Sequence, residues 1–193
     1  MISVGIYLFP KVELLDFAGP YEVFSVASEL HGYSLFSTFT VAEGPGEVQS
    51  VNGLRIVPDH TFAAHPAIDV LVIPGGVGTR TEMAKPMVLD WVLRTNETSR
   101  VSFSVCSGAR ILGALGLLDE LDVTTHHEVA EELRLIAPKA RVHTDRRFVD
   151  SGRIMTSAGI SAGIDLALHV VEQLCSADVA RKTLEYLEYT PGA

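Results

Sequence analysis

The stretch VSFSVCSGARILGALG, Val101 to Gly116, places a cysteine at the point where a strand is expected to end and a helix to begin. The residues up to Val105 form a short apolar run typical of a buried strand. Helical spacing then follows at Ile111, Leu112, Leu115 and Leu118. Ser107 and Gly108 leave the turn sterically open, as a sharp nucleophile elbow requires. The sequence predicts that Cys106 occupies such an elbow.

Two interpretations of Cys106 are open. A lone cysteine is often a small buried apolar residue. A thiol in the first turn of a helix, however, lies near the positive end of the helix dipole, which favours the thiolate. We therefore predict a reactive Cys106 with a lowered thiol pKa. Cys175, on the apolar face of a later helix, is expected to be structural.

The remainder of the chain alternates apolar runs with amphipathic segments, which predicts an α/β sandwich around a mostly parallel sheet. Strands are expected at 2–9, 34–42, 69–73, 100–105, 140–145, 146–150 and 153–159, with a small hairpin within 44–59. Helices are expected at 19–32, 80–99, 107–118, 126–137, 161–175 and 176–189. Without a repeat or a linker, residues 1–193 form one predicted domain.

Two further stretches are expected beside Cys106, because loops at the carboxyl ends of parallel strands converge. In IPGGVG, the N–H groups of Gly75 and Gly76 could hold developing negative charge. Asp16 follows the first strand. It could cap a helix or turn, or it could transfer protons beside the thiol.

The histidine pair in TTHHEVAEEL does not predict a metal site, because His126 and His127 are adjacent and the HExxH spacing is absent. His126 is expected either at the surface or in the wall of the pocket. Ser161 is expected to cap the helix that follows it.

Composition excludes several classes of function. The 193 residues carry a net charge of -9. The chain therefore lacks the excess of basic residues that is typical of a nucleic-acid-binding protein. No apolar run is long enough to span a bilayer, and the N-terminal residues lack the basic flank of a signal peptide. Two cysteines about 70 positions apart do not suggest a disulfide framework. A soluble, cytoplasmic protein is expected.

Several motifs resemble the ThiJ/PfpI superfamily, whose fold is like that of class I glutamine amidotransferases. They are LDFAGPYEVF, DVLVIPGGVG, SVCSGARILGALGLLD, TTHH, TSAGISAGIDLALHVVE and LEYTP, in that order. Within the superfamily, isonitrile hydratases and the ligand domains of AraC-type regulators are most similar. The resemblance implies a flavodoxin-like three-layer sandwich and a homodimer, with Cys106 as nucleophile and Asp16 as its acidic neighbour. The peptidase-like branch has a histidine where this chain has Ser107, which argues against a protease.

The resemblance and the elbow together favour hydration of an isonitrile to an N-substituted formamide. Cys106 would attack, Asp16 would serve as general acid and base, and N–H groups of Gly76 and Ser107 would hold charge. The substrate is expected to be a small molecule, and neither a metal nor an organic cofactor is needed. A glyoxalase or deglycase using the same pair is an alternative, as is a ligand- or oxidation-sensing domain.

Overall fold

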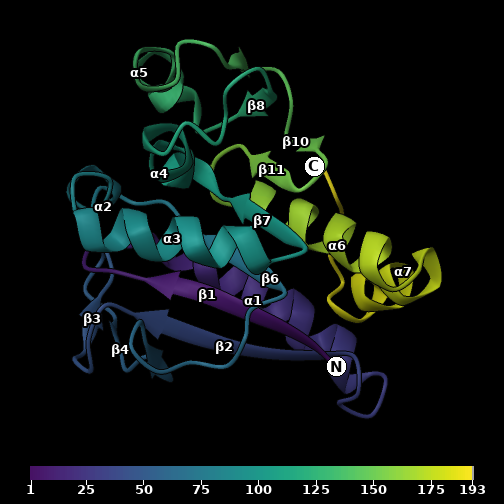
Figure 1. Cartoon of the computed structure of the whole chain (residues 1–193). Helices are drawn as coiled ribbons and strands as arrows, with labels where there is room; N and C mark the ends of the chain where they lie inside the picture. The colour runs from purple at the N-terminus through teal and green to yellow at the C-terminus, as the bar shows by residue number, and fades with distance from the viewer. Residues whose placement is uncertain (193) are drawn as a thin grey trace.

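The computed structural model describes residues 1–192 and has a central sheet between two layers of helices (Figure 1). The strands are β1 Ile2–Leu8, β2 Phe36–Ala42, β3 Val48–Gln49, β4 Arg55–Ile56, β5 His60–Thr61, β6 Val70–Ile73, β7 Val101–Ser104, β8 Asp122–Thr124, β9 Arg141–His143, β10 Phe148–Ser151 and β11 Ile154–Ser157. The α-helices are α1 Leu14–Glu29, α2 Thr79–Glu82, α3 Pro86–Thr98, α4 Ala109–Ala114, α5 Ala130–Ile136, α6 Ala162–Leu174 and α7 Ala177–Tyr186. Short 3₁₀ turns cover Cys106–Gly108 and His127–Val129. Ala193, the last residue of the predicted domain, lies outside the described residues.

Within residues 1–192, seven strands form the main sheet in the order β10-β11-β7-β6-β1-β2-β5. All neighbouring pairs are parallel except β10 with β11. The inner strands β1, β6 and β7 are almost wholly buried, which explains their continuous apolar sequences. The predicted α/β class with a mostly parallel sheet is confirmed.

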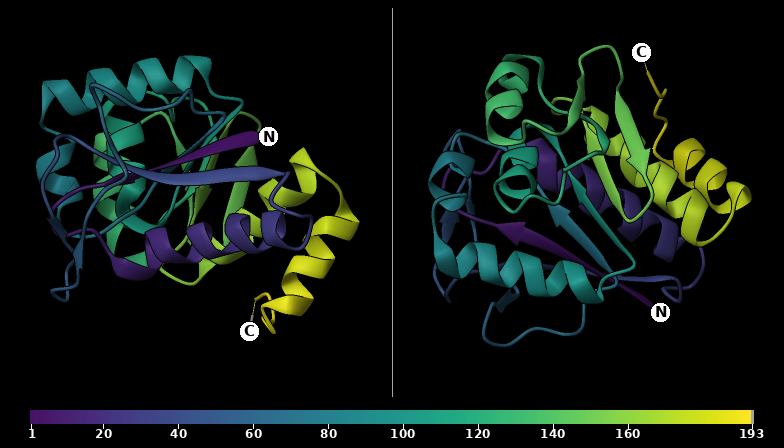
Figure 2. Two further views of the ribbon diagram at one scale, coloured as in Figure 1. Left: turned by 90° about the horizontal axis from the view of Figure 1, so that it is seen from below. Right: turned by 45° about the horizontal axis from the view of Figure 1, so that its top comes forward.

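Different helices cover the two faces of the sheet. Helices α1, α6 and α7 pack against one another on one face of the sheet, and α3 covers the opposite face (Figure 2). Helix α5 and the small parallel pair β8 and β9 lie at one end, next to α4. No helix among the described residues is long and apolar enough to cross a membrane.

Several predicted boundaries were wrong, for identifiable reasons. Helix α1 begins at Leu14 rather than Gly19, because Pro20 is accommodated inside the helix instead of starting it. The helix expected at 107–118 is shorter: α4 ends at Ala114, and Gly116 has a positive φ of 70°. The two-residue β5 and three-residue β8 were missed, because runs so short carry little periodicity.

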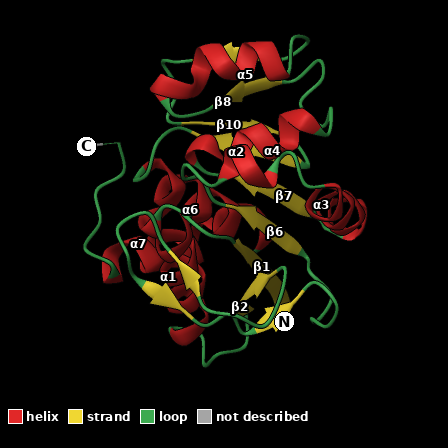
Figure 3. Ribbon diagram, turned by 90° about the vertical axis from the view of Figure 1, so that its left-hand side faces the viewer, coloured by secondary structure: helices red, strands yellow, loops and turns green. Residues whose placement is uncertain are grey.

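Strand order determines where a ligand site can form. From β1 the chain adds β2 on one side and β6 on the other, so that β1 and β6 border the point where the strand order reverses. Ligands of open α/β sheets bind beyond the carboxyl ends of the strands at this point. Figure 3 looks onto this edge, where the loops after β1, β6, β7 and β11 come together.

Candidate active site

Cys106 occupies a strained turn immediately after β7. Its φ is +55°, a left-handed conformation that is uncommon for residues other than glycine. The turn is held by two hydrogen bonds: Cys106 N–H donates to the carbonyl of Ala158 at 3.1 Å, and Thr125 Oγ1 donates to the Cys106 carbonyl at 2.7 Å. The side chain is buried, with 8% of the residue exposed. This is the predicted elbow.

Asp16 lies in the first turn of α1 and is fully buried. It does not cap the helix, because Glu13 is the N-terminal cap and accepts the N–H of Leu14. The Gly75 N–H donates to Asp16 Oδ2 at 2.9 Å, whereas Oδ1 has no hydrogen-bond partner among the described residues. Of the two roles open for Asp16, the geometry therefore removes capping.

Asp16 and Cys106 affect each other's titration. Burial raises the pKa of Asp16 to about 7, against a smaller lowering by the Gly75 N–H and the Cys106 side chain. Burial and the negative charge of Asp16 raise the pKa of the Cys106 thiol to about 12. Two adjacent buried acids cannot easily both be charged, so the pair retains at least one proton at neutral pH and one proton above pH 7.

The thiol pKa therefore moves in the opposite direction from the sequence prediction. The Ser107 and Ile160 N–H groups do stabilise a thiolate, yet desolvation outweighs them. The helix that should supply the dipole consists of one 3₁₀ turn followed by six residues of α4. A dipole acts mainly within the first turn and is small for so short a helix.

The N–H groups of Gly75 and Gly76 are both occupied by hydrogen bonds within the protein. Gly75 N–H is occupied by Asp16, and Gly76 N–H donates to Ser107 Oγ at 2.9 Å. A Cβ on Gly75 would lie 2.7 Å from Asp16 Oδ2 and 2.6 Å from Ser107 N, so no larger residue fits there. The sequence placed these glycines correctly beside Cys106, but their N–H groups bind the protein itself and not a substrate oxyanion.

Ser107 links the elbow to the glycine loop. Its hydroxyl accepts the Gly76 N–H and can donate to the Gly76 carbonyl at 3.1 Å. Its backbone N–H faces the sulfur of Cys106. Ile160 supplies a second N–H to the sulfur from the loop between β11 and α6, and it does so with an unfavourable φ of +46° for a β-branched residue.

A pocket of about 280 Å³ opens above the thiol. Its lining residues are Glu13, Gly76, Val77, Arg80, Cys106, Ser107, Arg110, His126, Glu128, Val129 and Ile160. His126 belongs to this wall, so the pocket alternative for that residue holds. Its Nδ1 accepts the Glu128 N–H at 3.2 Å, which leaves the proton of the neutral ring on Nε2. Burial lowers the pKa of His126, which keeps the ring neutral at pH 7.

Arg110 was missed by sequence reasoning, although it lies in the quoted stretch. The residue is buried, and its guanidinium donates to Thr79 Oγ1 at 3.0 Å and to Glu132. Arg80 binds the same carboxylate, and the two arginines lower the pKa of Glu132. An arginine on an otherwise apolar helix face was the signal that could have identified it.

The other candidates lie outside the site. Cys175 is half-buried at the end of α6, and burial raises its pKa. Ser161 precedes α6 but makes no capping hydrogen bond; its hydroxyl accepts Arg147 Nη2 at 3.3 Å instead. His127 stacks near His126, with 4.3 Å between ring centroids. Residues 1–192 contain no group of three or more side chains suited to hold a metal ion.

Exchange of Asp16 for asparagine should change the pH dependence of stability. Folding raises the pKa of this carboxyl from 3.8 to about 7, so its contribution to stability is complete below pH 3.8 and is lost as the pH rises through about 7. At about 1.4 kcal/mol per pKa unit the loss amounts to about 4 kcal/mol. Asparagine does not titrate. Denaturant unfolding of both proteins at several pH values should show that the free energy of unfolding of Asp16→Asn increases relative to that of the natural chain as the pH rises. A difference that does not depend on pH would contradict the burial of this charge.

Comparisons with known proteins show the family of the chain. Residues 2–173 match the family model described as "DJ-1/PfpI family". An isonitrile hydratase from Pseudomonas putida is 34% identical over 194 residues, covering 99% of this chain and 80% of the relative. A transcriptional regulator from Pseudomonas aeruginosa, GbdR, is 28% identical over 169 residues; this chain spans about half of that regulator, 46% of its length.

Solved structures show the same fold. A ThiJ/PfpI family protein from Pseudomonas syringae superposes with a TM-score of 0.88 at 29% identity, covering 100% of this chain and 76% of that one. DJ-1beta of Drosophila melanogaster gives 0.86 at 20% identity and covers 98% of both chains. The flavodoxin-like sandwich is therefore confirmed, and the chain belongs to the DJ-1/PfpI family.

Proposed function

We propose that the protein hydrates an isonitrile to an N-substituted formamide, with Cys106 as nucleophile and Asp16 as general acid and base. The observation that carries this proposal is the fully buried Asp16 carboxyl next to Cys106, a residue that lines a small pocket. The 34% identity to an isonitrile hydratase over nearly the whole chain supports the same chemistry.

The first half of the reaction uses the shared proton. Asp16 takes the thiol proton as the sulfur attacks the terminal carbon of the isonitrile, and then delivers that proton to the same carbon. The product is a thioimidate, R–N=CH–S, bound to Cys106. Asp16 is left as a carboxylate, ready to act as a base.

Water completes the reaction. Asp16 takes one proton from water as the hydroxyl adds to the thioimidate carbon, and passes that proton to the nitrogen. The tetrahedral intermediate collapses, the sulfur leaves as thiolate, and Asp16 takes the hydroxyl proton. The formamide departs, and the pair regains the single proton with which it began.

Hydrogen-bond donors other than the glycine loop must stabilise the charges that develop on the sulfur and on the substrate during the reaction. The Ser107 and Ile160 N–H groups face the sulfur and stabilise it whenever it carries negative charge. The Nε2–H of His126 is available to an oxygen or nitrogen of the substrate in the pocket. We assign His126 this binding role in place of the Gly76 N–H, which is already occupied.

Activity should follow the protonation state of the pair. The form with one proton predominates above pH 7, so kcat/KM for p-nitrophenyl isocyanide should rise with pH until about 7 and then level off. Asp16→Asn should lose on the order of 100-fold or more in turnover. Cys106→Ser should be inactive, whereas its matched control, Cys175→Ser, should keep natural activity.

The same proteins should be assayed with methylglyoxal, because a glyoxalase or deglycase would use the same residues. Turnover of methylglyoxal without isonitrile hydration would replace the proposed substrate. A well-folded Asp16→Asn protein with full activity would remove Asp16 from the mechanism. Turnover of neither compound would favour a ligand- or oxidation-sensing domain over an enzyme.

We also propose that the protein is a homodimer, on the basis of the family resemblance and because two-fold dimers are the commonest oligomers. Sedimentation equilibrium at micromolar concentration should give twice the 20.9 kDa mass of the chain. A single species at the mass of one chain would refute the dimer.

A further inference from the structure

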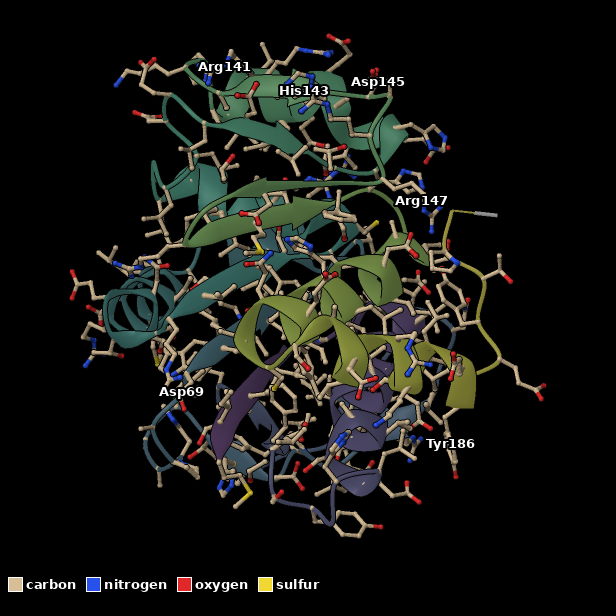
Figure 4. All side chains as sticks on the ribbon, turned by 90° about the vertical axis from the view of Figure 1, so that its right-hand side faces the viewer. Asp69, Arg141, His143, Asp145, Arg147 and Tyr186 are labelled. Atoms are coloured by element: carbon tan, nitrogen blue, oxygen red, sulfur yellow. The ribbon has the colours of Figure 1, made fainter. Side chains whose placement is uncertain are left out.

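A cluster of four side chains, which we call the Asp165 cluster, connects the start of α6 with the C-terminal segment. It consists of Asp165 on α6, Arg147 before β10, Ser161 before α6 and Tyr189 after α7. None of these side chains lines the thiol pocket. Figure 4 shows Arg147 beside the C-terminal segment, and Tyr186 lies away from Arg147 in the same view.

Asp165 is the centre of the cluster. Its side chain is only 5% exposed, and each of its oxygens has a partner: Oδ2 binds Arg147 Nε, and Oδ1 accepts the hydroxyl of Tyr189 at 3.0 Å. Arg147 Nη2 also reaches the Tyr189 hydroxyl, at 3.4 Å. A buried carboxylate is tolerated only when it is paired in this way, so removal of the Tyr189 hydroxyl leaves Oδ1 unpaired.

The cluster connects to the loop that faces the thiol. Arg147 Nη2 donates to Ser161 Oγ, and the Arg147 carbonyl accepts the Ala158 N–H at 2.8 Å. Between these two anchors lies Ile160, which lines the same pocket as Cys106 and whose N–H is directed toward the Cys106 sulfur. The Ala158 carbonyl in turn accepts the Cys106 N–H.

Ile160 needs such anchoring because of its backbone. A β-branched residue at φ +46° is strained and persists only where its surroundings fix it. Released from its anchors, the loop would relax and move the Ile160 N–H away from the sulfur.

We infer that Tyr189 is a positioning residue which, through Asp165 and Arg147, holds the Ile160 N–H against the Cys106 sulfur. The inference deepens the proposed function and rests on it only for the effect on turnover. It ties Tyr189 to the reactivity of a thiol whose pocket the Tyr189 side chain does not line.

The test compares Tyr189→Phe with Tyr186→Phe, both in a Cys175→Ser background so that alkylation reports on Cys106. Tyr186 is a matched control, because it lies nearby on α7 and is 58% exposed. Rate constants for iodoacetamide are measured from about pH 6 to pH 11, together with melting temperatures. Tyr189→Phe should lower the rate about threefold or more below the thiol pKa and move the profile to higher pH, since one pKa unit is a tenfold change in thiolate. Tyr186→Phe should leave the alkylation rate and its pH profile unchanged.

The groups that face Cys106 and could shape this profile remain the same in all variants. They are Asp16, Glu13, Arg80, Arg110, His126 and Glu128. A change in the alkylation profile that occurs in Tyr189→Phe but not in Tyr186→Phe therefore reports on the position of the loop.

A second variant distinguishes a displaced loop from a general loss of stability. Arg147→Lys keeps a positive charge beside Asp165 but loses the fork that also reaches Ser161, and it should change the profile in the same direction. Lower melting temperatures with an unchanged alkylation profile would overturn the inference and leave the cluster purely structural.

Hydration of p-nitrophenyl isocyanide by the same variants separates this inference from the proposed function. If the natural chain hydrates no isonitrile, the alkylation profiles still decide the role of Tyr189. If it does, kcat should fall in Tyr189→Phe with little change in KM. Natural kcat and natural alkylation in Tyr189→Phe would refute the positioning role alone.

Discussion

The burial of two acidic side chains, Asp16 and Cys106, next to each other is the constraint around which the site is organised. Asp16 is wholly buried and Cys106 nearly so, and a second negative charge in that space would lack both water and a neighbouring cation. The protein does supply N–H donors, from Gly75 to the carboxylate and from Ser107 and Ile160 to the sulfur. These donors favour a negative charge on either group, and in the proposed mechanism proton transfer within the pair moves that charge from one acid to the other.

The pair can exist only because backbones from separate strands approach closely. Asp16 follows β1, Gly75 follows β6, Cys106 follows β7 and Ile160 follows β11, and these strands are neighbours in the sheet. Parallel strands end at the same edge, so residues distant in sequence meet there without any long excursion of the chain. Cys106 and Ile160, two of the non-glycine residues with a positive φ, lie at this edge, where the surrounding hydrogen bonds hold them.

Sequence patterns identified this edge because each component has a local signature. A buried apolar strand followed by glycines, or by a cysteine and small residues, is visible in a single stretch. The partner of each N–H group is not local. Whether Gly76 donates to a substrate or to Ser107 Oγ depends on a contact between residues 31 positions apart. For the same reason the binding partners of Arg110, which are Thr79 and Glu132, could not be predicted from the sequence, nor could the Asp165 cluster.

The error in the predicted thiol pKa changes the view of the chemistry. A helix dipole strong enough to lower the pKa would give a permanent thiolate, open to oxidation in the absence of substrate. Burial instead keeps Cys106 as a thiol at rest, with a neighbouring base that can take its proton. A thiolate formed in this way is intrinsically more nucleophilic than one from a low-pKa thiol, because nucleophilicity rises with basicity. Oxidation sensing requires standing thiolate, whereas catalysis requires only that the proton moves as the substrate is attacked. The raised pKa of the thiol therefore agrees with the proposed role of Asp16 as the base that takes its proton.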